Sequence, residues 1–403
     1  MSYCLATYRI YDDKADFNQK AQSIAIGMTV GSWTELPQAK RDAMQKHLGS
    51  VQSVDIHDGG PGERYADLTI AYPDVNFSRD IPALIVTVFG KISMDGRIKL
   101  MKLGFSEAFL SAFSGPKFGI SGLREQLGVY DRPLLMSIFK SVIGLNLDEL
   151  REQFTRQALG GVDLIKDDEI LFENALTPIE KRVEACIRAA EEAERETGKK
   201  LLYAANLTGP TSQLRAQALK AIDAGANALL FNVLAYGYDV LHELSSDPAV
   251  SVPIAAHPSL AGAAYPSPHY GISASVLLGQ LMRLAGADLV LFPSPYGSVT
   301  MPREENMAIR DVLITPDSPL KACMPVPSAG IHPGLVPLIV RDFGTDVVVN
   351  AGGGIHGHPL GTEAGGRAFV QAIEAVQQNV PLAQYARTHP ELQSALDTWG
   401  GER

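Results

Sequence analysis

The four residues KDDE at positions 166–169 are the most unusual group of side chains in this sequence, because one amine and three carboxylates follow a short apolar run. Side chains alternate between the faces of a strand, so Lys166 and Asp168 are expected on one face and Asp167 on the other, with Glu169 where the chain leaves the strand. Buried charges are costly without a compensating cation, and Mg²⁺ prefers oxygen ligands. On these residues alone, a metal site and a solvated cluster of salt bridges both remain open.

Two glycine-rich turns form a second candidate site. They are PSAGIHPG, which contains Gly330, and NAGGGIHGHPLG, which contains Gly352 and Gly353. In α/β barrels the backbone N–H groups of such turns bind phosphate, helped by the N-terminus of a following helix, which is expected here near Gly366. The alternative interpretation is that these glycines serve turn geometry only.

The elements that must position these residues are short apolar strands that alternate with amphipathic helices from about Leu134 onward. Eight strand–helix units close a TIM barrel, whose active site lies at the carboxyl ends of its strands. At such an end, His257 could contact a substrate or only form structural hydrogen bonds. The eight runs end at Lys140, Asp168, Leu207, Val233, His257, Ser294, Ser328 and Gly352.

The chain before residue 125 has a different pattern. The runs ATYRIY, YADLTIAYP and ALIVTVFG are typical of strands, and AQSIAIGM and FSEAFLSAF of helices. We therefore predict an α/β protein with a smaller N-terminal α+β domain of ferredoxin-like type at 1–125. The (β/α)8 barrel, with a C-terminal helical tail, is expected at 126–403.

Composition excludes several classes of function. A chain of 403 residues with 46% hydrophobic and 20% charged residues has the balance of an ordinary globular protein. The net charge of -10, without a Lys/Arg cluster, argues against nucleic acid as a partner. Three widely spaced cysteines predict neither disulfides nor a zinc site, and no apolar run approaches the roughly 20 residues of a membrane span. A cytoplasmic protein without a membrane partner is expected.

The segment GGVDLIKDDE resembles the activator motif of the RuBisCO family. In that motif the lysine reacts with CO2 to form a carbamate, which binds Mg²⁺ together with two following acids. The resemblance implies that Lys166 carries the carbamate and that Asp168 and Glu169 complete the metal site. An unperturbed lysine has a pKa near ~10.4, so little neutral amine is present at pH 8. Because neighbouring acids oppose a lower pKa, trapping of the carbamate by Mg²⁺ is the expected cause of its stability.

The resemblance extends along the barrel. PLLMSIFKSVIG is similar to the family strand that ends in a catalytic lysine, which implies that role for Lys140. It also implies that His257 contacts the substrate and that the turns with Gly330, Gly352 and Gly353 bind phosphate. Substrate contacts are expected at Lys91, Lys140, Lys166, Asp167, Asp168, Glu169, His257, Gly330, Gly352 and Gly353.

One difference from the carboxylases restricts the reactions that the resemblance implies. The loop FPSPYGSVTMPREE follows the sixth strand, where a carboxylase has a mobile lysine, and no Lys occurs between Ser294 and Leu320. Carboxylation is therefore not expected. Nearly every segment of the chain is instead similar to the RuBisCO-like proteins of methionine salvage.

That resemblance implies an isomerase. It would convert 2,3-diketo-5-methylthiopentyl-1-phosphate to its 2-hydroxy-3-keto enol by removing a proton from C1. Lys91 in TVFGKIS matches the base of this family, which acts on a neighbouring subunit, so a homodimer is implied. Nothing in the spacing selects Lys91, so without the resemblance it would be interpreted as a solvated surface lysine. Another RuBisCO-like isomerase of a sugar-like phosphate and a non-catalytic binding protein are the alternatives.

Overall fold

The computed structural model describes residues 2–31, 37–60, 62–316 and 318–401, and the contacts within it divide the chain into two compact units. The smaller unit contains the chain up to Ser114 together with Leu260–Ala285. The larger unit contains Gly115–Ser259 and the chain from Gly286 onward. These units describe packing, and the domain bounds 1–125 and 126–403 stay a prediction.

The larger unit is built on an eight-stranded sheet in the order β12-β11-β9-β8-β7-β6-β5-β13. All neighbouring strands in this order run parallel, and β12 also contacts β13, so the sheet closes into a barrel. This confirms the predicted (β/α)8 barrel. The strands are β5 (Leu134–Ile138), β6 (Leu164–Lys166), β7 (Leu202–Leu207), β8 (Ala228–Phe231), β9 (Ile254–Ala256), β11 (Leu289–Pro293), β12 (Met324–Ser328) and β13 (Val348–Ala351).

Apolar side chains fill the interior of the barrel. Met136, Leu164, Leu230, Leu291 and Val326 belong to one buried cluster, to which all eight barrel strands contribute. Because these strands are covered on both faces, their sequences are almost continuously apolar. Polar side chains at the carboxyl ends of the strands therefore stand out against this core.

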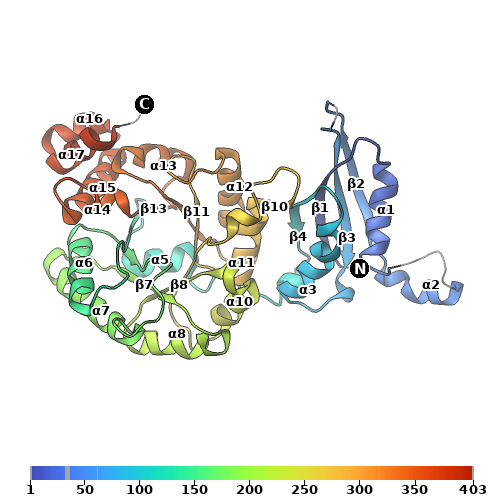
Figure 1. Cartoon of the computed structure of the whole chain (residues 1–403), viewed down its shortest axis with the longest axis horizontal. Helices are drawn as coiled ribbons and strands as arrows, with labels where there is room; N and C mark the ends of the chain where they lie inside the picture. The colour runs from blue at the N-terminus through green and yellow to red at the C-terminus, as the bar shows by residue number, and fades with distance from the viewer. Residues whose placement is uncertain (1, 32–36, 61, 317, 402–403) are drawn as a thin grey trace. The chain divides into compact units, whose positions relative to one another are not determined.

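Helices follow the strands and lie outside them, as α6, α7 and α8 show in Figure 1. The predicted helix LDELREQFTRQAL is α6, which begins after a capping box formed by Asn146 and Glu149. The helices of this unit are α5 (Gly119–Leu127), α6 (Leu147–Leu159), α7 (Ile179–Thr197), α8 (Leu214–Asp223), α9 (Val233–Tyr236), α10 (Tyr238–Ser246), α12 (Arg303–Ile314), α13 (Val336–Phe343), α14 (Gly353–His356), α15 (Thr362–Gln377), α16 (Leu382–Tyr385) and α17 (Pro390–Trp399).

The smaller unit contains a five-stranded sheet in the order β10-β4-β1-β3-β2. Strand β1 pairs antiparallel with β3 and β4, and β2 pairs antiparallel with β3, which gives the predicted ferredoxin-like arrangement. Its elements are β1 (Tyr3–Tyr11), α1 (Phe17–Gly27), α2 (Gln38–Met44), β2 (Ser50–His57), β3 (Tyr65–Pro73), α3 (Ile81–Ile85), β4 (Ile98–Gly104), α4 (Glu107–Leu110), β10 (Gly271–Ile272) and α11 (Leu281–Ala285).

The strand predicted at ALIVTVFG is wrong. Residues 81–94 instead form α3, one turn of π-helix (Val86–Gly90) and a 3-10 turn (Lys91–Met94). β-branched residues favour strands only weakly. Here the side chain of Asp80 caps the helix, and buried Ile81, Leu84 and Val88 recur at the spacing of a helix.

The segment Leu260–Ala285 leaves the barrel sequence and packs in the smaller unit. Its short strand β10 pairs in parallel with β4. The buried amine of Lys99 donates hydrogen bonds to the carbonyl oxygens of Tyr265 and Ser267, at 2.6 and 2.7 Å. The chain connection between β9 and β11 is thereby tied to the N-terminal sheet.

Two predictions from composition can be compared with this structure. Within the described ranges, none of the helices combines the length and apolar character needed to cross a bilayer. The three cysteines, all of which are described, are buried thiols, as expected for a chain without a disulfide framework.

Candidate active site at the carboxyl ends of the barrel strands

A cavity of about 270 Å³ lies within the barrel unit, where the strands end. It brings together seven of the ten predicted site residues from positions far apart in the sequence. Strand register explains part of this, because Ile138 of β5 pairs with Lys166 of β6. The predicted residues on its wall are Lys140, Lys166, Glu169, His257, Gly330, Gly352 and Gly353.

Lys166 is the most deeply buried of these groups, with 1% of its side chain exposed. Its Nζ lies 3.5 Å from Glu169 Oε2 and donates a 3.0 Å hydrogen bond to the carbonyl oxygen of Asp167. Burial lowers the pKa of this amine, although Glu169 and Asp168 act in the opposite direction. From the sequence, the neighbouring acids are expected to prevent a lower pKa of Lys166, because the sequence shows these acids but does not show how deeply the amine is buried.

Asp168 and Lys140 form an ion pair beside this amine. The Nζ of Lys140 lies 2.7 Å from Asp168 Oδ2, and Lys140 is much more exposed than its buried partner. The carbonyl oxygen of Lys140 accepts a 2.8 Å hydrogen bond from the side-chain amide of Gln153 on α6. Helix α6 therefore fixes the turn that presents this lysine to the cavity.

His257 is a neutral donor in this structure. Its Nδ1 accepts from the backbone N–H of Ser259 at 3.3 Å and lies 2.8 Å from the hydroxyl of Ser259. Burial, reinforced by the charge of Lys166, lowers the pKa of His257 to about 3. The proton of the neutral ring is therefore on Nε2, which lies 3.5 Å from Glu169 Oε2. From this position the ring can donate to a bound oxygen.

Asp167 does not reach the cavity, although a substrate contact is predicted for it. Its carboxylate is fully buried and accepts hydrogen bonds from Arg182 at 3.1 Å, from Tyr203 at 2.7 Å and from the backbone N–H of Asn206 at 2.8 Å. The alternation of side chains along β6, which the sequence shows, sends Asp167 to the opposite face from Lys166.

The glycine turns form the wall of the cavity next to β12 and β13. A Cβ atom on Gly352 would lie 3.0 Å from Cε of Lys140, and one on Gly330 would lie 2.3 Å from the backbone nitrogen of Ser298. The backbone at Gly330 also has a φ of +68°. Gly330 therefore requires glycine for the cavity to have its present form, whereas a Cβ at Gly352 would have to displace the flexible side chain of Lys140. Gly353 has open space around it instead.

The helix start expected near Gly366 is wrong. The first helix after β13 is the single turn α14, which begins at Gly353, and α15 begins at Thr362. Gly366 lies inside α15, where a Cβ would meet the backbone of Gly160 at 2.7 Å. Close packing of two helices explains this glycine. The unsatisfied N–H groups of a first helical turn belong to Gly353 and Gly354 instead.

Several polar residues on the wall were not predicted. The side-chain amide of Asn350 donates a 2.8 Å hydrogen bond to the hydroxyl of Ser328, and the buried Oδ1 of Asn350 finds no partner in the described part of the chain. Both residues lie at the ends of apolar strands, as does His257. Their position at strand ends is the feature of the sequence that could have identified Asn350 and Ser328 as site residues. The sequence prediction relied on the neighbouring glycines instead. Ser298 also lines the cavity.

The residues fit a metal site of the predicted kind only if the lysine is modified. Among the described residues, no three or more His, Cys, Asp or Glu side chains gather as metal ligands. Asp168 and Glu169 supply carboxylates, so a third protein oxygen would have to come from a carbamate on Lys166. The side-chain amides of Asn206 and Asn232 donate to the carbonyl oxygen of Glu169 at 3.0 and 3.2 Å, which holds the backbone of Glu169 in place.

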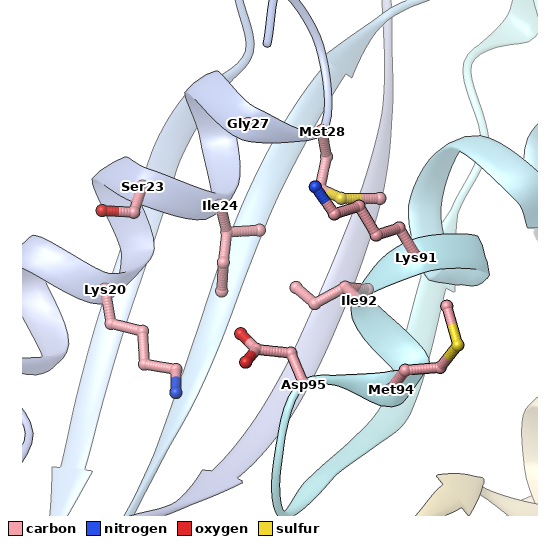
Figure 2. A pocket seen from close by; sticks show the side chains of 9 residues that line it. All are labelled: Lys20, Ser23, Ile24, Gly27, Met28, Lys91, Ile92, Met94 and Asp95. Atoms are coloured by element: carbon pink, nitrogen blue, oxygen red, sulfur yellow. The ribbon is translucent and has the colours of Figure 1, made fainter. Parts of the chain in front are cut away.

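Lys91 belongs to the smaller unit and lines a different cavity, of about 400 Å³. It is exposed and lies at the junction between the π-helical turn and the 3-10 turn. Figure 2 shows Lys91 and Met28 at one end of this cavity and Lys20 and Asp95 at the other. π-helical turns are frequent at functional sites, which sets this exposed lysine apart from others.

Comparisons with known proteins agree with this architecture. The family model of the ribulose bisphosphate carboxylase large chain matches twice, with its N-terminal domain at residues 2–105 and its catalytic domain at residues 119–399. The chain is 54% identical to the 2,3-diketo-5-methylthiopentyl-1-phosphate enolase of Bacillus licheniformis over 99% of this chain and 98% of that protein.

Solved structures show the same relationship. A RuBisCO-like protein (MtnW) from Alicyclobacillus acidocaldarius superposes with a TM-score of 0.94 at 50% identity, covering 99% of each chain. The RuBisCO of Pyrococcus horikoshii superposes with a TM-score of 0.91 at 30% identity, covering 99% of this chain and 93% of that one. The chain belongs to the RuBisCO large-chain family, and within it to the RuBisCO-like proteins. It is therefore an enzyme.

Because the space around Gly353 is open, a substitution at this residue tests whether the backbone N–H groups of the glycine turns bind phosphate. We expect Gly353→Ala to fold normally and to bind inorganic phosphate about tenfold or more weakly, because a methyl group blocks close approach to the backbone N–H groups. Isothermal titration with phosphate measures this. Gly330→Ala, which is strained and crowded, should instead lose about 1–3 kcal/mol of stability. Gly262→Ala, at an exposed glycine with open space, is the control, and undiminished phosphate binding by Gly353→Ala would contradict the assignment.

The buried neutral ring of His257 predicts acid sensitivity. A histidine in the unfolded chain takes up its proton near pH ~6.5, whereas His257 in the folded protein has a pKa of about 3. The unfolded state thus binds the proton first, so this contribution to stability is present above about pH 6.5 and is lost as the pH falls towards 3. In metal-free buffer, His257→Asn should lose less stability than the wild type between pH 6.5 and pH 4 in urea unfolding. His57→Asn, on the surface of the other unit, is the control, and equal losses for His257→Asn and the wild type would refute the prediction.

Proposed function

We propose that this enzyme is an isomerase of methionine salvage that converts 2,3-diketo-5-methylthiopentyl-1-phosphate to 2-hydroxy-3-keto-5-methylthiopentenyl-1-phosphate. The observation that carries the proposal is the single cavity that brings the Lys166 amine and the Glu169 carboxylate to the glycine turns. Relatives that are named for this reaction match over nearly their whole length, which supports the choice of substrate.

The metal site of the proposal consists of Lys166 as a carbamate, Asp168 and Glu169, with Mg²⁺ bound to their oxygens. When bound, Mg²⁺ would polarise the two carbonyl oxygens of the diketone and stabilise the negative charge that develops on enolisation. The lowered pKa of Lys166 supports carbamylation, because CO2 reacts with the neutral amine. Formation of the carbamate would release Asp168 and Glu169 from compensating a buried ammonium group.

The side chains and backbone around this centre have separate roles. The N–H groups at Gly330, Gly352 and Gly353 would hold the phosphate at one side of the cavity. Nε2 of neutral His257 would donate a hydrogen bond to a substrate oxygen, and Lys140 would place a positive charge near the reacting carbons. Carboxylation is not part of the proposal, because the loop after β11 contains no lysine.

Lys91 of a partner subunit is the proposed base that removes the C1 proton, so the proposal includes a homodimer. Exposed apolar side chains on the loops that follow β5 and β6 support a protein partner, since such groups are covered in an interface. They are Ile143, Ile170, Phe172 and Leu176. A RuBisCO with 30% identity, from Hyperthermus butylicus, is described as dimeric. The buried thiols agree with a reducing, cytoplasmic environment.

Removal of the Lys166 amine tests the metal site. We expect Lys166→Ala to lose Mg²⁺-dependent enolisation while the protein remains folded, because the third metal ligand is missing. Lys166→Met fills the space of the lysine without its amine and should behave in the same way. The rate of enol formation is followed by absorbance and folding by circular dichroism, with Lys181→Ala on the surface of α7 as the control. Full activity in either Lys166 variant would disprove the proposal.

Substitution of the proposed base should separate binding from chemistry. Lys91→Ala is expected to bind the substrate but to lose exchange of the C1 proton with deuterated solvent, which NMR detects. Because Lys91 is exposed, its removal should not disturb the fold. Lys102→Ala, another exposed lysine of the same unit, is the matched control. If exchange continued at the wild-type rate in Lys91→Ala, Lys140 would become the candidate base.

A further inference from the structure

The buried ion pair between Arg182 and Asp167 lies outside the cavity and has no role in the proposed reaction. Both side chains are fully buried, with 0% exposure, and Arg182 Nε lies 3.1 Å from Asp167 Oδ2. Burying two charges costs more free energy than a surface pair, and replacing such a pair by apolar residues is often neutral or stabilising. Stability alone is therefore a weak explanation for this pair.

The contacts of the pair span three consecutive elements of the barrel. Arg182 is on α7, and its Nη1 donates a 2.8 Å hydrogen bond to the carbonyl oxygen of Thr177. Asp167 follows β6 directly and accepts from the hydroxyl of Tyr203 on β7 at 2.7 Å and from the backbone N–H of Asn206 at 2.8 Å. The backbone N–H of Asp167 donates to the carbonyl oxygen of Ala204 on β7 at 3.0 Å. Asp167 is thus held through both its carboxylate and its backbone.

Asp167 lies between Lys166 and Asp168, two of the three proposed metal ligands. Neighbouring side chains at a strand end point to opposite faces, so an Asp167 side chain held on the outer face directs its neighbours into the barrel. The carbonyl oxygen of Asp167 also accepts the 3.0 Å hydrogen bond from Lys166 Nζ. A shift of Asp167 would therefore move the amine and the following carboxylate together.

We propose that Arg182, acting through Asp167, is a positioning residue that holds Lys166 and Asp168 in the geometry needed for carbamate formation and metal binding. Tyr203, whose hydroxyl donates to the same carboxylate of Asp167, is a second positioning residue. This inference rests on the metal site of the proposed function, and it assigns a task to a charged pair that neither touches the cavity nor lies at the surface. Replacing a residue that orients a metal ligand without itself binding the metal typically weakens metal affinity about 10–100-fold.

The test uses the full-length protein with 13C-labelled bicarbonate and Mg²⁺ and follows the carbamate signal by 13C NMR as Mg²⁺ is added. The double variant Arg182→Met with Asp167→Asn removes both charges and leaves no lone ion in the interior. It should remain folded and require about tenfold or more Mg²⁺ for half-maximal signal. Tyr203→Phe, which loses one hydrogen bond and keeps the ring, should show a smaller shift in the same direction. Arg188→Met, an exposed arginine of the same helix, should match the wild type.

The outcomes separate this inference from the proposed function. If the wild type gave no carbamate signal, the proposed metal site would fail, and amide hydrogen exchange of residues 163–171 would then decide the positioning role. Exchange there should be faster in both variants than in the wild type, and unchanged exchange would overturn the inference. If the wild type gave the signal and both variants matched its Mg²⁺ dependence, the inference would likewise be wrong. Should the double variant not fold, the response of Tyr203→Phe decides.

Discussion

Burial of the Lys166 amine is the constraint on which the arrangement of the barrel site depends. An ammonium group with 1% exposure must be compensated by nearby negative groups or lose its proton. The lowered pKa of Lys166 shows that desolvation outweighs the two acids beside it. Burial of its own ring, reinforced by the charge of Lys166, lowers the pKa of His257, and Asp168 forms its ion pair with the more exposed Lys140. A carbamate would reverse the charge at this point, and two further carboxylates could then share a cation.

The charged residues at the end of β6 have different roles on the two faces of the strand. Lys166 faces the cavity, whereas Asp167 is held by Arg182 and Tyr203 on the other side. A period of two along the strand is sufficient for this division. Its consequence is that adjacent residues of one short motif have different surroundings, so a motif cannot be treated as a uniform set of substrate contacts.

Most of the chain between β9 and β11 packs in the smaller unit and not with the barrel. Directly after His257, the segment from Leu260 onward packs with the N-terminal sheet through β10 and Lys99. Lys91 is presented by the same smaller unit, at a junction between two irregular helical turns. Groups that the proposed reaction needs therefore depend on two separately packed parts of the chain.

The sequence by itself determined the barrel, because eight apolar strands separated by amphipathic helices have few other ways to bury their surfaces. It also located half of the residues that line the cavity, since site residues of a barrel lie at strand ends. Only the tertiary structure decided the helical form of residues 81–90, where the packing of Leu84 and Val88 outweighed strand propensity. It also decided the lowered pKa values of Lys166 and His257, because desolvation depends on atoms from distant segments. The tertiary structure also decided the role of Gly366. The sequence pattern suggested a helix start there, whereas close packing against Gly160 explains why this residue is a glycine.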